Sequence, residues 1–410
     1  MGFDFRQRAD ARQAAIPAGA WLMLAPALVP FFFQMGRGLG NTGFVLAWVA
    51  LAVLVVKQRA WRAVPMYGAL VLWILLLVSG GVSAALSIAP ADAMEKWVRY
   101  AWMGSIYFLM AMLLSRRDHP ALGWMLERIG WIGLASFGWL LGHTLLTYDI
   151  PGFQPQFHIR GLVPAYLSPF VLYWMARRFT GMTRSGVMGA YSIVLAWLLV
   201  HANSLTEVLA LAAALFVLAM FRVPTLRLRL GVLTALLAGF VALILAFDPA
   251  GKVIVSNAPG TAVQTDGNAW IAFADKLSSQ RTLIWRQAVA TPPPNPWLGV
   301  GAGNVGAFSP VRMEGLGAVK HLHNLFLDMW YELGFIGAAL LLALSTGQFV
   351  HALRRRDPAT MPLLYAATAA ILVAALLEQS YRSYHLALFL PFLFALFAYA
   401  PRAESSRAPA

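Results

Sequence analysis

The sequence predicts an all-α, polytopic integral membrane protein, and three observations support that prediction. The chain has 410 residues, of which 60% are hydrophobic and only 12% are charged. Its mean hydropathy is +0.67, and its apolar fraction exceeds the about 45–50% of an ordinary soluble domain. Apolar stretches of about 17 or more residues recur from end to end, and a stretch of that length is long enough for a helix to cross a bilayer.

Hydropathy divides residues 1–410, which we treat as a single membrane domain, into about twelve candidate transmembrane helices. They lie near 17–35, 43–56, 66–88, 98–114, 121–147, 162–176, 186–202, 206–221, 230–247, 324–350, 361–378 and 384–400. Between the ninth and the tenth, residues 248–322 form one long loop that is rich in proline and glycine. Within this loop, SSQRTLIWRQAVAT predicts a short helix, with Ser278 as its N-cap and the prolines from Pro292 to Pro294 as its end.

The basic residues predict how these helices are oriented. The net charge is +14, and most of the 31 Lys and Arg residues lie in the two terminal segments and in alternate short loops. The positive-inside rule places those segments, and both termini, in the cytoplasm and residues 248–322 on the opposite, periplasmic face. The positive charge therefore indicates contact with anionic membrane lipids and not a nucleic-acid partner. No small-residue cleavage site follows the basic N-terminus, so we expect an uncleaved first span.

Titratable residues gather where the long loop enters the tenth span. His323 and Asn324 begin this apolar run, which Gly334 and Gly337 interrupt, and His321 lies just before them. A helix N-terminus disfavours an imidazolium ion and offers free N–H groups to an anion. His323 is therefore a candidate general base beside a phosphate, although simple anchoring at the membrane interface is the alternative for a single histidine.

Further polar residues have weaker but related contexts. Asp328 and Glu332 lie four residues apart on one face of the same span, where we expect them to orient a neighbouring group. Arg281 and Arg286 lie in the short loop helix, and His158 and Arg160 precede the sixth span. The planar set of N–H donors on an arginine side chain suits a diphosphate, so these arginines are candidates to bind one. The alternative interpretation is that they are solvated surface residues.

Several kinds of site have no support in the sequence. The chain has no cysteine, which excludes disulfides, iron–sulfur clusters and thiol catalysis. Residues Gly301 to Gly306 fit G-x-G-x-x-G, but prolines precede them and no βαβ unit surrounds them, so they predict a tight turn and not a dinucleotide site. His321 and His323 have no clear third ligand nearby, so we expect neither a metal nor a cofactor.

Three segments together resemble the O-antigen ligase family of membrane glycosyltransferases. His323-Asn324, with Gly334 and Gly337 after them, resembles that family's signature of His, then Asn, Ser or Gln, nine residues, Gly, two residues and Gly, Thr or Tyr. SSQRTLIWRQA, with PWLGVGAGNVGAF after it, and IRGLVPAYLSPFVLYW resemble two further family segments, each with an arginine. One departure is Ser204-Leu205, where family members often carry Ser-Arg.

The resemblance implies metal-independent transfer of O-antigen polysaccharide from undecaprenyl diphosphate to a sugar hydroxyl of lipid A–core. The reaction would complete lipopolysaccharide at the periplasmic face of the inner membrane of a Gram-negative bacterium. In that scheme His323 takes the hydroxyl proton, while Arg281 and Arg160 hold the diphosphate and stabilise its developing charge. The residues expected to bind substrate are Arg286, His321, Asn324 and His158, and those expected to orient the site are Glu332, Asp328, Gly334 and Gly337.

Three other functions remain open on the sequence. An O-antigen polymerase would use the same carrier lipid, but such proteins often have two sizeable outer loops and only one is predicted here. A protein O-oligosaccharyltransferase usually carries a further C-terminal domain, and we expect none. A transporter or flippase for an anionic lipid would place its ionisable groups near mid-membrane, whereas most here cluster at one face.

Overall fold

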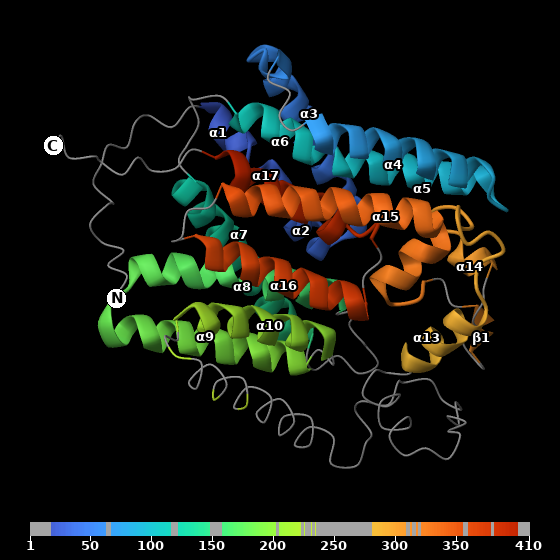
Figure 1. Cartoon of the computed structure of the whole chain (residues 1–410). Helices are drawn as coiled ribbons and strands as arrows, with labels where there is room; N and C mark the ends of the chain where they lie inside the picture. The colour runs from blue at the N-terminus through green and yellow to red at the C-terminus, as the bar shows by residue number, and fades with distance from the viewer. Residues whose placement is uncertain are drawn as a thin grey trace, which may run out of the picture.

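The computed structural model confirms the all-α, membrane-protein fold (Figure 1). It describes residues 18–62, 67–115, 122–147, 158–201, 205–222, 225, 231, 234, 281–308, 312–313, 317–318, 321–355, 360–378 and 381–400. Most of the expected span at 230–247, the loop as far as residue 280 and the proposed N-cap Ser278 lie outside the described residues. Apart from two strands of two residues each, every regular element in the described part is helical.

Each expected span other than 230–247 coincides with one helix or with two consecutive helices. In chain order they are α1 (Ala18–Leu22), α2 (Ala25–Met35), α3 (Arg37–Lys57), η1 (Ala60–Arg62), α4 (Tyr67–Ala85), α5 (Pro90–Gly104), α6 (Ile106–Leu114), α7 (Leu122–Thr147), α8 (His158–Arg178), α9 (Gly181–His201), α10 (Leu205–Arg222), α13 (Arg281–Ala290), α14 (Val305–Phe308), α15 (Leu325–Arg354), α16 (Met361–Leu377), the π-helix η2 (His385–Phe389) and α17 (Leu390–Tyr399). The strands β1 (Arg312–Met313) and β2 (Gly317–Ala318) form an antiparallel pair.

Several helices are long and apolar enough to cross a membrane. Among the described residues there are 6 of them: Arg37–Lys57, Tyr67–Ala85, Pro90–Leu114, Leu122–Leu146, Gly181–Leu199 and Leu325–Arg354. Shorter apolar helices occupy Ala25–Met35, Thr206–Phe221, Met361–Leu377 and His385–Tyr399. These lengths support a polytopic protein, and the total of about twelve spans stays a prediction.

The helices pack as a bundle whose surface and core are both apolar. Phe170 of α8, Leu364 of α16 and Phe392 of α17 are fully buried in one continuous core. Val53 of α3 and Ile193 of α9, in contrast, are 56% and 71% exposed. Contiguous exposed apolar surface is unfavourable in water but is the normal outer surface of a bundle in lipid, so this distribution supports the membrane assignment.

A small cap closes one end of the bundle. Figure 1 shows α13 and α14 beside the end where α15 begins and α16 finishes. Ile284 and Ala288 of α13, Val305 of α14, and Leu322 and Tyr331 form a second apolar cluster there, separate from the bundle core. The Tyr331 hydroxyl donates a 2.6 Å hydrogen bond to the Ala288 carbonyl. The loop helix α13 is therefore fixed to the first turns of α15, as a cap that the site can be built on.

Helix α15 is divided at Gly334. The backbone there has φ 66° and ψ −176°, which is outside the helical region and favours glycine. The Gly-rich turn docks at this break: the N–H groups of Val300 and Gly301 donate to the carbonyls of Tyr331 and Glu332 at 2.8 and 3.0 Å. The N–H of Phe335 donates in turn to the Pro296 carbonyl at 2.9 Å.

The break therefore divides α15 into a short part before Gly334 and a long apolar part after it. The tight turn expected from residues Gly301 to Gly306 exists, with Gly301 and Gly303 at positive φ. The segment that leads into it, residues 296–301, satisfies backbone groups that the break exposes. Gly337 lies buried on the long part, where an added Cβ would be 2.5 Å from the Cβ of Leu333.

Candidate functional site

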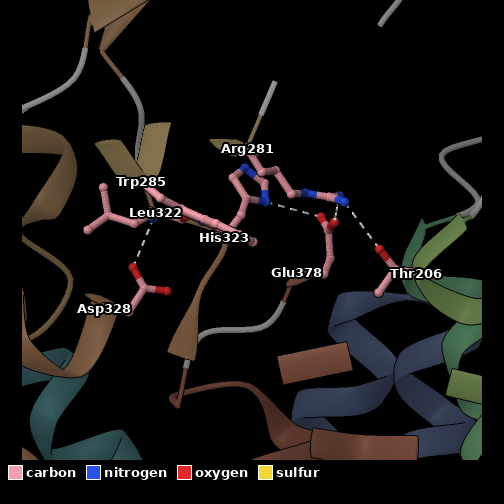
Figure 2. A network of polar contacts seen from close by, with 7 residues as sticks. All are labelled: Thr206, Arg281, Trp285, Leu322, His323, Asp328 and Glu378. Atoms are coloured by element: carbon pink, nitrogen blue, oxygen red, sulfur yellow. Dashed lines mark hydrogen bonds and ion pairs between the residues drawn. The ribbon is translucent and has the colours of Figure 1, made fainter. Parts of the chain in front are cut away.

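The candidate site lies at the capped end of the bundle, where α10, α13, α15 and α16 meet (Figure 2). Asn324 is the N-cap of α15, and its Oδ1 accepts hydrogen bonds from the N–H groups of Phe326 and Leu327 at 3.0 and 3.2 Å. Its Nδ2 donates to the carbonyl of Leu376 in α16 at 3.3 Å. Asn324 therefore begins the helix and ties it to α16, and its expected contact with substrate stays a prediction.

His323 precedes this cap in a left-handed backbone conformation, with φ 52°. Its Nδ1 lies 3.4 Å from Oε1 of Glu378, the residue that follows the last turn of α16. When the proton is on Nδ1, on the side of this carboxylate, the neutral ring carries its lone pair on Nε2. That is the protonation pattern that a general base requires.

Arg281 reaches the same carboxylate from the opposite side. Its Nη2 donates to Oε2 of Glu378, and its Nη1 lies 3.4 Å from Oγ1 of Thr206 in the first turn of α10. Figure 2 shows Glu378 between His323 and Arg281, with Thr206 beyond the guanidinium. The side chains of Arg281, Glu378 and His323 are only 13%, 18% and 26% exposed, so water screens their interactions weakly.

A second carboxylate lies behind this network. Glu207 of α10 is 1% exposed, and its electrostatic neighbours include Glu378 and Arg281. Glu207 follows Thr206 directly. The O-antigen ligases that the sequence resembles often carry an arginine at this helix start. The start of α10 thus provides a hydroxyl that contacts Arg281 and a buried carboxylate within electrostatic range of it.

Asp328 lies one turn into α15 and is fully buried. Its Oδ1 accepts a hydrogen bond of 2.9 Å from the backbone N–H of Leu322, the residue before His323. The Leu322 carbonyl accepts a 3.0 Å hydrogen bond from the indole Nε1 of Trp285 in α13. These contacts join Asp328 and Trp285 to the residue before His323, and the orienting role expected for Asp328 stays a prediction.

Glu332 is fully buried one turn further along α15 and pairs with Arg382. The Arg382 Nε and Nη2 atoms lie 2.8 and 3.1 Å from the two carboxylate oxygens, which is a bidentate ion pair. Burial acts against the charge on Arg382, but Glu332, Tyr381 and Asp328 outweigh it and raise the pKa of Arg382 above its usual value. Arg382 therefore keeps its charge and joins the segment before η2 to α15.

The other residues expected in the site lie around this network. The ring of His321 is 4.4 Å from that of His323, centroid to centroid, and Arg286 is exposed on α13. His158 and Arg160 form the first turn of α8, but their side chains lie outside the description, so their approach to the site stays a prediction. Within the described part of the chain, no three His, Asp or Glu residues are grouped as a metal site would require.

Sequence reasoning missed the importance of Glu378, Thr206 and Trp285. Glu378 was noticeable only as an acidic residue that ends an apolar run, which is an unusual place for one. It is far from His323 and Arg281 along the chain, and no spacing rule joins them. Trp285 follows Arg281 by four residues, so a shared helix face was predictable, but its partner Leu322 was not.

Comparison with known proteins supports the resemblance stated from the sequence. Residues 190–342 match the family model described as O-antigen ligase. The matched segment contains Thr206, Arg281, Trp285, His323 and Asp328, whereas Glu378 lies beyond it. A comparison with curated proteins found no match.

Proposed function

We propose that this chain, whose residues 190–342 match the family model of the O-antigen ligases, is a glycosyltransferase that completes lipopolysaccharide. It transfers O-antigen polysaccharide from undecaprenyl diphosphate to a sugar hydroxyl of lipid A–core. The family supports a membrane ligase or polymerase of lipid-linked polysaccharide, and the ligase reaction is the proposal. Its location is the periplasmic face of the inner membrane, with both termini in the cytoplasm.

One observation carries the proposal: a single carboxylate, Glu378, contacts both a histidine and an arginine at the capped end of the bundle. Nε2 of His323 takes the proton from the acceptor hydroxyl as the new bond to the anomeric carbon forms. Glu378 stabilises the imidazolium ion that results, in the manner of the carboxylate in a hydrolytic triad. A general base of this kind contributes typically about 10²–10⁴ to the rate.

Arg281 acts on the leaving group, the diphosphate. As the bond between the anomeric carbon and the diphosphate oxygen breaks, its electron pair stays on the diphosphate, whose negative charge increases. A guanidinium has five N–H donors, so Arg281 can contact Glu378 and Thr206 and still offer donors to phosphate oxygens. The donor is already activated by its diphosphate, so the proposal needs no nucleotide, cofactor or metal ion.

The direct test is transfer in vitro with the purified protein, undecaprenyl-diphosphate-linked glycan and lipid A–core, in the presence of EDTA. Glycan on lipid A–core, lost in His323→Ala and Arg281→Ala, is the expected result. His351→Ala and Arg354→Ala are matched controls, because both residues lie at the opposite end of α15.

The same assay separates the alternatives. Longer glycan on undecaprenyl diphosphate, without product on lipid A–core, would identify a polymerase. Transfer to a protein acceptor only would identify a protein O-oligosaccharyltransferase. Movement of the carrier lipid across vesicles without any covalent product would identify a transporter and overturn the enzyme proposal.

A further inference from the structure

We infer that Trp285 and Asp328 are positioning residues that hold His323 at a set distance from Arg281. The inference rests on the proposed function, in which His323 and Arg281 act on opposite sides of the bond that is exchanged. Neither Trp285 nor Asp328 is assigned contact with substrate; both act through the backbone of Leu322.

The first step concerns the two backbone polar groups of Leu322. Its N–H donates to Oδ1 of Asp328 at 2.9 Å, and its carbonyl accepts from Nε1 of Trp285 at 3.0 Å. Figure 2 shows the contact between Asp328 and Leu322. A loop residue whose N–H and C=O are both bound by side chains has little freedom to rotate.

The second step concerns the conformation that this arrangement supports. His323 follows Leu322 directly and has φ 52°. Non-glycine residues seldom adopt this left-handed region, and they persist there only when their surroundings hold them. The Asn324 cap fixes the backbone after His323, and the Leu322 contacts fix the backbone before it.

The third step links this geometry to Arg281. Trp285 lies four residues after Arg281 on α13, so both side chains project from the same face of one rigid helix. The Leu322 side chain is fully buried between the two elements, against Ile284 of α13 and Tyr331 of α15. Leu322 thus links His323 to the helix that carries Arg281, in addition to the carboxylate of Glu378 that both residues contact.

Chemistry explains why this distance matters. His323 must meet the acceptor hydroxyl while Arg281 meets the leaving diphosphate, and the two groups flank one carbon atom. In positioned reactions, a displacement of about 1 Å can lower the rate about 10²-fold. A mobile His323 would less often lie beside the acceptor hydroxyl.

The test compares Trp285, whose indole N–H donates a hydrogen bond, with Trp330, whose indole N–H donates none within the described part of the chain. Trp285→Phe removes an indole N–H that binds Leu322 and keeps an aromatic ring. Trp330→Phe is the matched control, because its indole N–H has no hydrogen-bond partner among the described residues. We expect Trp285→Phe to lower kcat by about 10–10²-fold with the KM for the donor unchanged, and Trp330→Phe to leave both near the native values.

Two further variants separate positioning from packing. Asp328→Asn keeps an oxygen acceptor for the Leu322 N–H and should retain more kcat than Asp328→Leu, which has none. In a His323→Ala background, Trp285→Phe should have no further effect on residual transfer, since it acts only through His323. Size-exclusion profiles and Tm in detergent must match the native protein for each comparison.

The outcomes distinguish this inference from the proposed function. If His323→Ala keeps full transfer, the proposed function fails. If His323→Ala abolishes transfer but Trp285→Phe equals Trp330→Phe, the proposed function stands and the positioning role is refuted. The positioning role is also refuted if Trp285→Phe lowers the residual transfer of His323→Ala further, or if Trp285→Phe changes only the KM for the donor.

Discussion

Glu378 contacts His323 and Arg281 at once, so the protonation state of the base and the position of the cation depend on one side chain. Its negative charge compensates the imidazolium ion during proton transfer. It also limits how far Arg281 can move toward a bound anion. Substitutions here should therefore change the reaction more than they change the fold.

Glu378→Gln should lower kcat by about 10²-fold or more, because an amide has no charge to stabilise the imidazolium and can favour the wrong tautomer. The change in kcat is measured by transfer assays at a saturating concentration of the lipid-linked donor. Glu127→Gln is the control, since Glu127 also pairs with an arginine, Arg177 at 3.1 Å, on partly exposed surface. Equal rates for the two variants would remove Glu378 from the mechanism.

Arg281→Lys keeps the charge but loses the planar fork, so one ammonium group cannot reproduce the contacts to Glu378, Thr206 and a phosphate. We expect kcat/KM for the lipid-linked donor to fall about 10-fold or more. Arg354→Lys, at the far end of α15, should keep the native value. A fully active Arg281→Lys would mean that only the charge at this position is needed.

Helix α15 shows how elements are joined around the site. Its short part before Gly334 carries Asp328 and Glu332, and its long part after Gly334 packs along the bundle. The Gly334 break turns this helix into two pieces that the docked segment of residues 296–301 holds together. Two features of this junction, one steric and one electrostatic, are open to measurement.

Gly334→Ala should destabilise the protein by about 3 kcal/mol or more, since the new Cβ would lie 2.2 Å from Trp297 and φ is positive. Thermal unfolding in detergent measures the change. Gly81→Ala in α4 is the control, because its Cβ would meet nothing within 4 Å and alanine favours a helix. Similar Tm values for both variants would contradict the close docking of residues 296–301.

Arg382→Met should also destabilise, because it leaves the fully buried Glu332 without its ion-pair partner; the expected cost is about 3–5 kcal/mol. Adding Glu332→Gln should recover part of that loss, since it removes the buried charge. The Tm values of the native protein, both single variants and the double variant form the measurement. No recovery in the double variant would show that packing, and not charge, explains the loss.

Among the described residues, the least exposed ion pairs lie at one end of the bundle, whereas the more exposed pair of Glu127 and Arg177 joins α7 to α8. The network of Arg281, Glu378 and His323 and the Glu332–Arg382 pair both lie at the end that α13 caps. Such one-sided placement suits an enzyme that meets lipid-linked substrates at one membrane face better than it suits a transport pathway through the bilayer.

The predicted orientation can be tested directly because the chain has no cysteine. Val289→Cys on α13 and Met182→Cys on α9 introduce single thiols at side chains that are 62% and 92% exposed. A membrane-impermeant maleimide, admitted to the periplasm, should label the first in intact cells and the second only after the inner membrane is opened. The reverse pattern would place the candidate site in the cytoplasm.

The helical spans and the start of α15 were predictable from the sequence because they are local properties, and the role of His323 as general base stays a prediction. Hydropathy adds along a chain, so segments such as 67–85 are recognisable alone, and His323-Asn324 before an apolar run already indicates a capped helix. The predicted glycine interruption at Gly334 was likewise visible, although its partner was not.

The tertiary structure alone decided which residues share the site. Glu378 joins His323 and Arg281 across α13, α15 and α16, and Trp285 reaches Leu322 from another element. It also assigned the Gly-rich segment to the break in α15. These contacts link residues tens of positions apart, and such distances depend on how helices pack; periodicity and spacing describe only neighbours along the chain.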